Sequence, residues 1–508
     1  MNLRPELAQH LRQRLQAFSE GFRQNLALIG PAGSGKTYQL QQLVAEPTPS
    51  LSLVFCPLYR ESAQSFLKRL LCAILPAADR DVPNTTAAVR QVEGLLARRL
   101  YGEAFNRALD VIPILIEERQ RPCVLLLDEF LFLEDLGLAH AFHELGKRVM
   151  TSPSTLFLLS SSSPYRARMI LRERLHLLFG QFELVSLEGL DAAIASLWVQ
   201  RELKGLRGVS TLAPFLLQWL GAYPWYLTVM ITRLKERALL EQSRELTEAL
   251  FLQTAWDLLG TPPGALHQWC ASRLEAVSQK RLGARAVDAL IQVASGVRTT
   301  TDLGKRIGRG GLPEALQLLV EQDLAERKGM CWVVTDPILR TWLSTVCAAQ
   351  RADARQGGAE RREGMEQHLR MLWSRWMQAT HLSFAEQVVA LLTKFCDDTV
   401  SLDSKTGRLP RFEAIRTQPP VSPGSDAYLI ADGPGRRWCA TVHSEPADEY
   451  AIASFDAFCH AQSPKPSRKV VIVKSGMDDN ARLLAKATNM WVWQLDDLKT
   501  LHSLYGPL

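Results

Sequence analysis

The chain has 508 residues, of which 47% are hydrophobic and 22% are charged, and its formal net charge is +6. These proportions exclude a disordered or fibrous protein, and the length predicts three or four domains at roughly 150 residues each. The mild positive charge allows contact with nucleic acid but does not by itself indicate it.

The cysteines and the N-terminus indicate a compartment. Nine cysteines are scattered along the chain, and no two have the two-residue spacing of a zinc knuckle, so we expect free thiols in a reducing compartment. Residues 1–24 are polar with helical periodicity, unlike a signal peptide. The most apolar run, residues 123–133, is interrupted by Asp128 and Glu129 and is too short to span a bilayer. These features predict a cytoplasmic protein with no membrane partner.

The first 190 residues alternate between apolar runs and helical periodicity. The runs that predict buried strands are residues 25–29, 51–56, 123–127, 156–159 and 182–187. Helices are expected around residues 5–23, 37–45, 62–75, 104–119 and 138–150. Strands that alternate with helices predict an α/β fold, with a parallel sheet that is covered on both faces.

A glycine-rich turn between the first strand and the next helix matches G-x-x-x-x-G-K-[ST] at every fixed position. Its residues are Gly30, Pro31, Ala32, Gly33, Ser34, Gly35, Lys36 and Thr37. Glycines let backbone N–H groups turn toward phosphates, and the helix N-terminus adds positive potential. Lys36 is therefore expected to neutralise the β- and γ-phosphates of ATP, and the Thr37 hydroxyl to ligate Mg²⁺.

Polar side chains follow two of the other predicted strands. Asp128 and Glu129 end the apolar run 124–127, and ligands of open α/β sheets bind at such strand ends. Asp128 is expected to hold Mg²⁺ through water, and Glu129 to orient or deprotonate the attacking water. After the strand at residues 156–159, Ser160 and Ser162 are candidates to reach the γ-phosphate or that water, with a plain serine-rich loop as the alternative.

Together these motifs resemble the AAA+/STAND side of the P-loop ATPases. Within it they resemble the archaeal-type ATPases, relatives of the origin-recognition and transposition-regulator ATPases. The resemblance covers residues 20–345. Residues 221–227 are similar to the G-x-x-P motif of the helical lid, which implies that Pro224 lies near the nucleotide; a simple helix-breaking proline is the alternative. Residues 336–343 are similar to the D-P-x-x-R-x-W-L ending of the group's winged helix.

One position departs from the pattern of this group. Its members carry Gly-Arg just before the fifth strand, where this chain has Gly180 and Gln181, with Arg172 and Arg174 nearby as replacements. An arginine finger contributes roughly 10³ to 10⁵ in rate, so its loss predicts slow or partner-dependent hydrolysis.

The remaining patterns complete a predicted architecture. Residues 191–279 contain helical patterns alone, and residues 284–342 combine three helical patterns with a hairpin that turns at Lys328 and Gly329. The expected domains are a P-loop ATPase core at 1–190, a helical lid at 191–279, a winged helix at 280–348, a linker at 349–367 and a restriction-endonuclease-like α/β domain at 368–508.

The position of basic residues in the predicted winged helix indicates how it would contact DNA. The helix at residues 312–322, in the recognition position, carries glutamates and glutamines and no basic residue. The basic residues are Lys305, Arg306 and Arg309, with Arg327 and Lys328 on the wing. Such side chains would hold the phosphates of duplex DNA without reading its sequence. A winged helix used for protein packing is the alternative.

Residues 368–508 resemble the PD-(D/E)xK nucleases, with Asp426 in the place of the first metal-binding carboxylate. Thr441 and His443 stand where the family has Glu-x-Lys, so a magnesium ligand and the cation that assists the attacking water are both missing. We expect a domain that binds or scaffolds rather than cuts. Glu445 would restore a metal ligand if the strand register shifted.

The leading hypothesis is an ATP-switched regulatory ATPase whose other domains engage DNA, a protein partner or further copies of the chain. Roles in transposition control, antiphage defence and factor loading are all compatible with it. The alternatives are an ATP-dependent nuclease and a STAND-type signalling scaffold with no nucleic-acid role.

Overall fold

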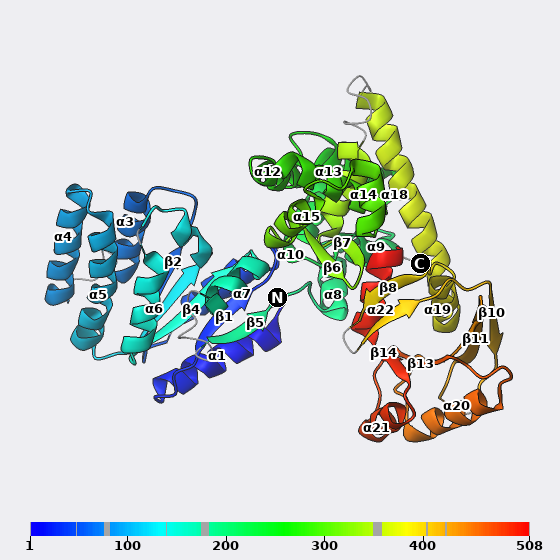
Figure 1. The fold of residues 1–508 in the computed structure, drawn as a ribbon. Helices are drawn as coiled ribbons and strands as arrows, with labels where there is room; N and C mark the ends of the chain where they lie inside the picture. Colours follow the sequence, from blue (N-terminus) through cyan, green and yellow to red (C-terminus); the bar gives the residue numbers. More distant parts are fainter. Residues whose placement is uncertain are drawn as a thin grey trace. The chain divides into compact units, whose positions relative to one another are not determined.

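The computed structural model describes residues 2–46, 48–75, 82–138, 140–173, 182–348, 358–402, 405–421 and 424–506. Figure 1 gives the order of its elements. Internal contacts divide the chain into two compact units, here called the first unit (residues 1–247 with 321–323) and the second unit (residues 248–320 with 324–508). This boundary lies inside the range predicted for the helical lid. Arg174, Gly180 and Gln181 lie outside the described residues.

The first unit contains the predicted parallel sheet. Its strands are β1 (Asn25–Ile29), β2 (Ser52–Pro57), β3 (Cys123–Asp128), β4 (Thr155–Ser161) and β5 (Phe182–Ser186). They pair in the order β2-β3-β4-β1-β5, and every pair is parallel. All five strands lie where apolar runs predicted them, because strands buried on both faces read as continuous hydrophobic segments.

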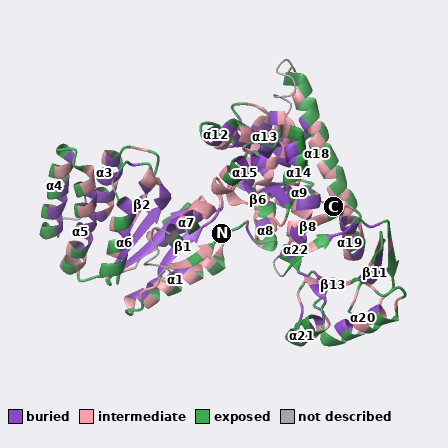
Figure 2. Ribbon diagram, in the orientation of Figure 1, coloured by how far each residue is buried: buried purple, intermediate pink, exposed green. Residues whose placement is uncertain are grey.

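Helices cover both faces of this sheet. Alternate side chains of each strand enter one of two cores: Leu26 and Leu28 face one, and Ala27 and Ile29 face the other. Figure 2 shows the buried residues concentrated along the strands. The covering helices of the first core are α1 (Pro5–Ser19) and α2 (Lys36–Ala45). Those of the second are α3 (Ala63–Ile74), α4 (Pro83–Ala97), α5 (Tyr101–Arg119), α6 (Ala141–Thr151) and α7 (Pro164–Glu173), with the short 3₁₀ turn η1 (Phe130–Glu134).

Helix α4 was not predicted, because its sequence is polar at its start. The Glu118 carboxylate on α5 accepts hydrogen bonds from the backbone N–H groups of Asn84 and Thr85, at 2.6 and 2.8 Å, and from the Thr85 hydroxyl. This acidic cap comes from a neighbouring helix, so the chain around α4 carries no local N-cap signal for it.

Three further helices complete the first unit: α8 (Ala192–Glu202), α9 (Val209–Leu220) and α10 (Pro224–Leu240). The Asp191 side chain caps α8 by accepting from the N–H groups of Ala193 and Ile194. Gly221, with φ +69°, ends α9 in the left-handed conformation, and Pro224 occupies the first turn of α10. The G-x-x-P residues therefore form the corner between two helices.

The second unit begins with helices and a β-hairpin. In chain order they are α11 (Glu248–Ala255), the π-turn η3 (Trp256–Gly260), α12 (Ala265–Ser278), α13 (Gly283–Ala294), α14 (Thr300–Ile307), α15 (Leu312–Glu321), β6 (Ala325–Lys328), β7 (Cys331–Val334), α16 (Pro337–Trp342) and the π-turn η4 (Leu343–Cys347). We call α13 to β7 the helix–hairpin module. Its three helices and antiparallel hairpin follow the order expected of a winged helix.

The C-terminal part contains a mixed sheet. Its strands β10 (Ala414–Gln418), β11 (Ala427–Gly433), β12 (Arg436–His443), β13 (Arg468–Val473) and β14 (Trp491–Trp493) pair in chain order, antiparallel as far as β12 and parallel beyond it. The other elements are α19 (Phe384–Leu392), α20 (Glu449–Ala461), α21 (Asp479–Ala487), α22 (Leu495–Tyr505) and the hairpin β8 (Asp398–Ser401) with β9 (Thr406–Leu409). Sequence patterns predicted β11 to β14 but not β8 to β10, which are short and carry few apolar residues.

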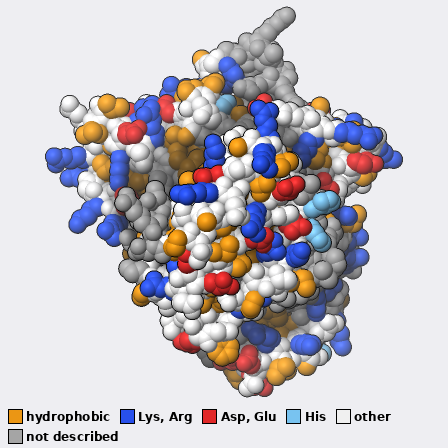
Figure 3. Space-filling view, turned by 90° about the vertical axis from the view of Figure 1, so that its left-hand side faces the viewer, with side chains coloured by type: hydrophobic (Ala, Val, Ile, Leu, Met, Phe, Trp, Pro, Cys, Tyr) orange, Lys and Arg blue, Asp and Glu red, His pale blue; other side chains and the backbone are white. Residues whose placement is uncertain are grey.

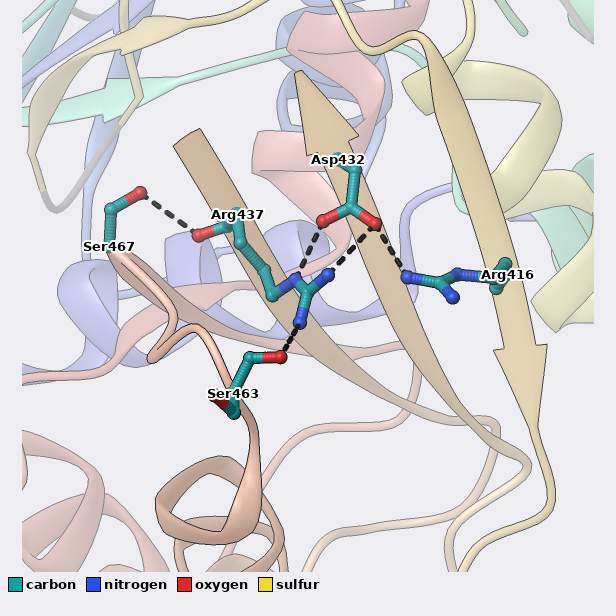
Figure 4. Close-up of polar contacts among 5 residues, drawn as sticks. All are labelled: Arg416, Asp432, Arg437, Ser463 and Ser467. Atoms are coloured by element: carbon teal, nitrogen blue, oxygen red, sulfur yellow. Dashed lines mark hydrogen bonds and ion pairs between the residues drawn. The ribbon is translucent and has the colours of Figure 1, made fainter. Parts of the chain in front are cut away.

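A charge cluster connects β10, β11 and β12. Asp432 accepts two hydrogen bonds from Arg437, at 2.6 and 3.2 Å, and a third from Arg416 at 2.6 Å. Figure 4 shows both guanidinium groups pointing at the same carboxylate. Arg437 also donates to the carbonyl of Ser463, and its own carbonyl accepts from Ser467. The hydrogen bond from Arg437 lowers the pKa of Asp432. One carboxylate thus bridges two arginines on the neighbouring strands, and these cross-strand contacts support the register of the sheet.

Helix α18 (Gly358–Thr380) begins within the range predicted to be a linker. Its first half has charged residues in place of an apolar stripe, and buries only Met365 and Leu369 along its described length. Glu366 pairs with Arg362 at 2.7 Å and with Arg370 at 3.3 Å, both at i,i+4 spacing. Such pairs stabilise a helix that hydrophobic periodicity does not reveal.

The hairpin of the helix–hairpin module packs against C-terminal elements of the second unit. Gly329 at its tip lies against β8, and the Met330 N–H donates to the Thr399 carbonyl at 2.8 Å. Cys331 and Val333 of β7 belong to the same hydrophobic core as Val400. Two polar contacts reinforce this packing. Arg298 pairs with Asp398 at 3.3 Å, and the half-buried Arg340 of α16 donates to the Ser503 carbonyl at 3.1 Å.

Three further features of the chain concern its surface, its thiols and the lengths of its helices. Basic, acidic and apolar side chains are interspersed on the face that Figure 3 shows. All nine cysteines are free. Of the helices in the described part of the chain, none is long and apolar enough to cross a membrane.

The packing of the hairpin tip predicts an asymmetry between two glycines. Gly329 (φ +71°) and Gly435 (φ +66°) are both left-handed, so alanine costs roughly 1–2 kcal/mol at either position. At Gly329 the new Cβ would also lie 2.6 Å from the Thr399 carbonyl oxygen, whereas at Gly435 nothing lies within 4 Å. We expect Gly329→Ala to lower the midpoint of guanidinium unfolding more than Gly435→Ala. Equal midpoints would contradict the docking of the hairpin on β8.

Candidate functional site

The predicted phosphate-binding loop joins β1 to α2. Gly33 and Gly35 have φ values of +80° and +93°, which only glycine adopts readily. Gly30 is required for a different reason, because a Cβ there would lie 2.4 Å from the Leu187 carbonyl oxygen. Its N–H donates to the Ser161 carbonyl at the end of β4. The glycines therefore serve both the curvature of the loop and its close approach to the sheet.

Lys36 is buried in the loop that it follows. Its side chain is 3% exposed, and its ammonium donates to the carbonyls of Gly30 at 2.8 Å and Pro31 at 3.0 Å. Burial lowers the pKa of Lys36, while Glu129 and Asp128 act in the opposite direction. The Ser34 hydroxyl is also buried and has no hydrogen-bond partner among the described residues. A buried cation on neutral carbonyls beside an unsatisfied donor fits an anion such as phosphate.

Asp128 joins three elements of the sheet. It accepts from the Thr37 hydroxyl at 2.6 Å through one oxygen and from the Ser160 hydroxyl through the other. Ser160 is fully buried and accepts from the Glu129 N–H at 3.2 Å. The carboxylate and the Thr37 hydroxyl are oxygen donors of the kind that Mg²⁺ prefers, with phosphates supplying further ligands. The described residues contain no cluster of three or more His, Cys, Asp or Glu that could hold a metal by themselves.

Glu129 is held in an uncommon backbone conformation. Its φ of 56° and ψ of 46° are left-handed, a strain that clusters at functional sites. Its carboxylate accepts from the Ser162 N–H at 2.8 Å and from the Ser162 hydroxyl. Burial raises the pKa of Glu129, while Lys36 and the Ser162 hydrogen bonds oppose the rise. Both predicted serines therefore contact the carboxylates, Ser160 at Asp128 and Ser162 at Glu129.

The G-x-x-P corner lies against the phosphate-binding loop. The Trp225 N–H donates to the Gly33 carbonyl at 3.2 Å, and a Cβ on Gly33 would lie 3.0 Å from the Cβ of Trp225. A Cβ on Gly35 would lie 3.7 Å from the Pro224 ring. The structure thus places both Pro224 and Trp225 beside the phosphate-binding loop.

Arg4 is a site residue that sequence reasoning missed. Its guanidinium donates two hydrogen bonds to the Ser34 carbonyl, at 3.1 and 3.2 Å, and another to the Glu188 carbonyl. Burial lowers the pKa of Arg4. The chain offered one local signal, a cation immediately before a helix that starts with proline. Only the packing of α1 on the sheet brings it to the loop.

The predicted DNA-contact residues belong to the second unit. Lys305 pairs with Asp302 at 2.9 Å, Arg306 donates to Gln292 and Arg327 donates to the Gly329 carbonyl. Lys328 lies 3.4 Å from Glu326. Arg309 is exposed at the turn between α14 and α15.

The nuclease-like positions of the C-terminal sheet are occupied by neutral or paired groups. Thr441 and His443 are both buried, and the Thr441 hydroxyl lies 2.9 Å from His443 Nε2. Burial lowers the pKa of His443. Asp426 accepts from the Ser444 hydroxyl at 2.5 Å. Strand β12 ends at His443, so Glu445 lies beyond the ladder and is exposed.

Comparison with known proteins found similarity to solved structures alone. No protein-family model and no curated protein matches the chain. A Walker-type ATPase of Pyrococcus abyssi aligns with 67% of this chain and 95% of its own, at 16% identity and a TM-score of 0.50. The ORC2 protein of Aeropyrum pernix, solved in ADPNP and ADP complexes, aligns with 70% of this chain and 96% of its own, at 15% identity and a TM-score of 0.47. At this identity the first likeness shows an archaeal Walker-type ATPase fold over two thirds of the chain.

The contacts of Arg4 predict that it supports nucleotide binding. Arg4→Ala removes a charged donor from the Ser34 carbonyl, and such a hydrogen bond contributes about 1.5–3 kcal/mol. We expect affinity for a fluorescent ATP analogue to fall roughly tenfold or more. Arg12→Ala, which removes an exposed arginine of the same helix, is the matched control. Equal affinities in the two variants would show that Arg4 does not support the loop.

The environment of Glu129 predicts the pH dependence of ATP turnover. A general base must be deprotonated, so activity falls when the pH drops low enough to protonate Glu129. Because the pKa of Glu129 is raised, this fall should begin at a higher pH than for an ordinary glutamate. Ser162→Ala removes the hydroxyl hydrogen bond that lowers this pKa and keeps the one from the backbone N–H, so the acid limb of the rate profile should move further up in pH. Ser163→Ala is the control. An acid limb that stays in place, or moves down, would remove Glu129 from the role of base.

Proposed function

We propose that this chain is an ATP-binding regulatory ATPase, in which nucleotide at the phosphate-binding loop sets the conformation or oligomeric state. The second unit then engages duplex DNA or a protein partner. The observation that carries the proposal is that a buried lysine, two carboxylates and their serine partners lie together at the carboxyl ends of three adjacent strands. The buried Lys36 follows β1, the carboxylates of Asp128 and Glu129 end β3, and their serine partners end β4.

Each group has a role in the proposed reaction. The loop N–H groups and Lys36 would hold the phosphates, and Thr37 with Asp128 would hold Mg²⁺, which would supply positive charge to them. Glu129 orients or deprotonates the attacking water, and Ser162 holds its carboxylate in place. Ser160 fixes Asp128 and the Glu129 backbone. Pro224 and Trp225 connect the state of the loop to α10.

Hydrolysis is proposed to be slow or dependent on a partner. Gln181, where related ATPases have arginine, lies outside the described residues, and Arg172 of α7 is exposed. A catalytic cation supplied by another copy or a partner would raise the rate by roughly 10³ to 10⁵. This property suits a switch, because the nucleotide state persists until the partner arrives.

The C-terminal domain is proposed to bind or scaffold without cutting DNA. Thr441 and His443 are bonded to each other inside the sheet, and Asp426 is bonded to Ser444. Metal-dependent DNA cleavage that disappears in Asp426→Ala would overturn this part of the proposal.

Two substitutions separate binding from turnover. Lys36→Ala removes the phosphate cation, and nucleotide affinity should be abolished. Glu129→Gln keeps the shape of the side chain, so binding should persist while turnover stops. Lys147→Ala and Asp135→Asn, exposed residues of the same unit, are matched controls.

The measurement is ATP hydrolysis by the full chain, titrated with duplex DNA at low and moderate salt. Stimulation by DNA supports the DNA-engaging form of the switch. Bound ATP without stimulation supports the protein-partner form. Hydrolysis unchanged in both Lys36→Ala and Glu129→Gln would overturn the site assignment.

A further inference from the structure

C-terminal elements of the second unit cover the hairpin of the helix–hairpin module at the backbone of its tip and along β7. The Gly329 tip touches backbone atoms of β8, and Cys331 and Val333 are buried in a core shared with Phe395 and Val400. The Tyr505 hydroxyl and Arg298 both contact Asp398, and Arg298 lies over the Tyr505 ring at 4.4 Å. The backbone of the tip is therefore fixed against β8, and the side chains of Arg327 and Met330 are what it leaves exposed.

A basic surface lies elsewhere in the same module. We call it the turn surface: Lys280, Arg281, Arg285, Lys305, Arg306 and Arg309. Lys280 and Arg281 precede α13, Lys305 and Arg306 end α14, and Arg309 lies in the turn before α15. Arg285 is half-buried and the other five are exposed.

Packing contacts bring these segments together. The Arg285 guanidinium donates to the Ile307 carbonyl at 3.0 Å. A Cβ on Gly311 would lie 3.5 Å from the Leu282 side chain, and one on Gly304 would lie 3.1 Å from the Cγ of Arg309. The beginning of α13 and the turn between α14 and α15 are therefore neighbours, and their cations form one surface.

The charge balance of the turn surface favours a polyanion. The helices α13, α14 and α15 carry four acidic residues against these six cations: Asp288, Asp302, which pairs with Lys305 at 2.9 Å, the exposed Glu314, and Glu321. The six cations are spread over two helix ends and a glycine-rich turn rather than gathered around one pocket. Spread cations suit a row of phosphodiester groups, whereas a single small anion needs a focused site.

We propose that the second unit binds duplex DNA through the turn surface and not through its hairpin. This inference rests on the DNA-engaging form of the proposed function. The contacts are to the phosphate backbone and independent of sequence, because the exposed face of α15 presents Glu314 and Gln317 rather than basic side chains. The covered hairpin serves as the joint between the module and the C-terminal sheet.

The test compares two matched double variants of the full chain. Arg281→Ala with Arg309→Ala removes two cations from the turn surface, and Arg327→Ala with Lys328→Ala removes two from the hairpin. Fluorescence anisotropy with a labelled duplex of mixed sequence is measured over a series of salt concentrations. The turn variant should bind about tenfold or more weakly at low salt, and its log–log salt slope should fall by about 1.8, as expected for two lost phosphate contacts. The hairpin variant should bind within about threefold of the parent chain.

Further variants and outcomes separate the explanations. Arg281→Lys with Arg309→Lys should restore binding if charge is what matters, and a failure of that rescue would overturn phosphate contact. A loss confined to the hairpin variant, or displacement of the duplex by inorganic phosphate at matched ionic strength, would also overturn the inference. A parent chain that binds ATP but no duplex overturns both this inference and the DNA-engaging form of the function. A parent chain that binds the duplex but no ATP would overturn only the proposed ATPase.

Discussion

The burial of the Lys36 ammonium is the constraint on which the site depends. A cation removed from water is costly unless it is paired, and here it is held by two loop carbonyls with the carboxylates of Asp128 and Glu129 acting at longer range. The loop can supply those carbonyls only because its glycines allow it to curve around the side chain. The arrangement is stable in the folded protein and leaves the charge ready for phosphate, so the same geometry explains both the loop and its proposed ligand.

The order of the strands converts this local feature into a site. Because β4 lies between β3 and β1, the ends of all three meet at one edge of the sheet. Ser160 can then reach Asp128, and Ser162 can reach Glu129, from the neighbouring strand. The serines hold the carboxylates in place. The left-handed backbone of Glu129 indicates that this position is maintained at some cost in strain.

The second unit uses its polar groups differently. Asp432 with its two arginines joins three strands, and Asp398 with Arg298 and Tyr505 joins the helix–hairpin module to the C-terminal elements. Buried Thr441 and His443 contact each other inside the C-terminal sheet. The unit is therefore a packed body, and Lys280, Arg281 and Arg309 of the turn surface are exposed on it.

The sequence by itself determined the elements of the first sheet, the phosphate-binding loop and the pair of carboxylates. Strands buried on both faces are continuous apolar runs, and the loop needs glycine and lysine at fixed spacing, so both signals are local. It did not reveal α4, the first half of α18 or strands β8 to β10, because their stability comes from a cap on another helix, from ion pairs and from cross-strand contacts. Only the tertiary structure decided that Arg4 and Trp225 join the loop and that the hairpin is covered. Those contacts link residues far apart in the chain, and no local pattern encodes which distant surface a side chain will meet.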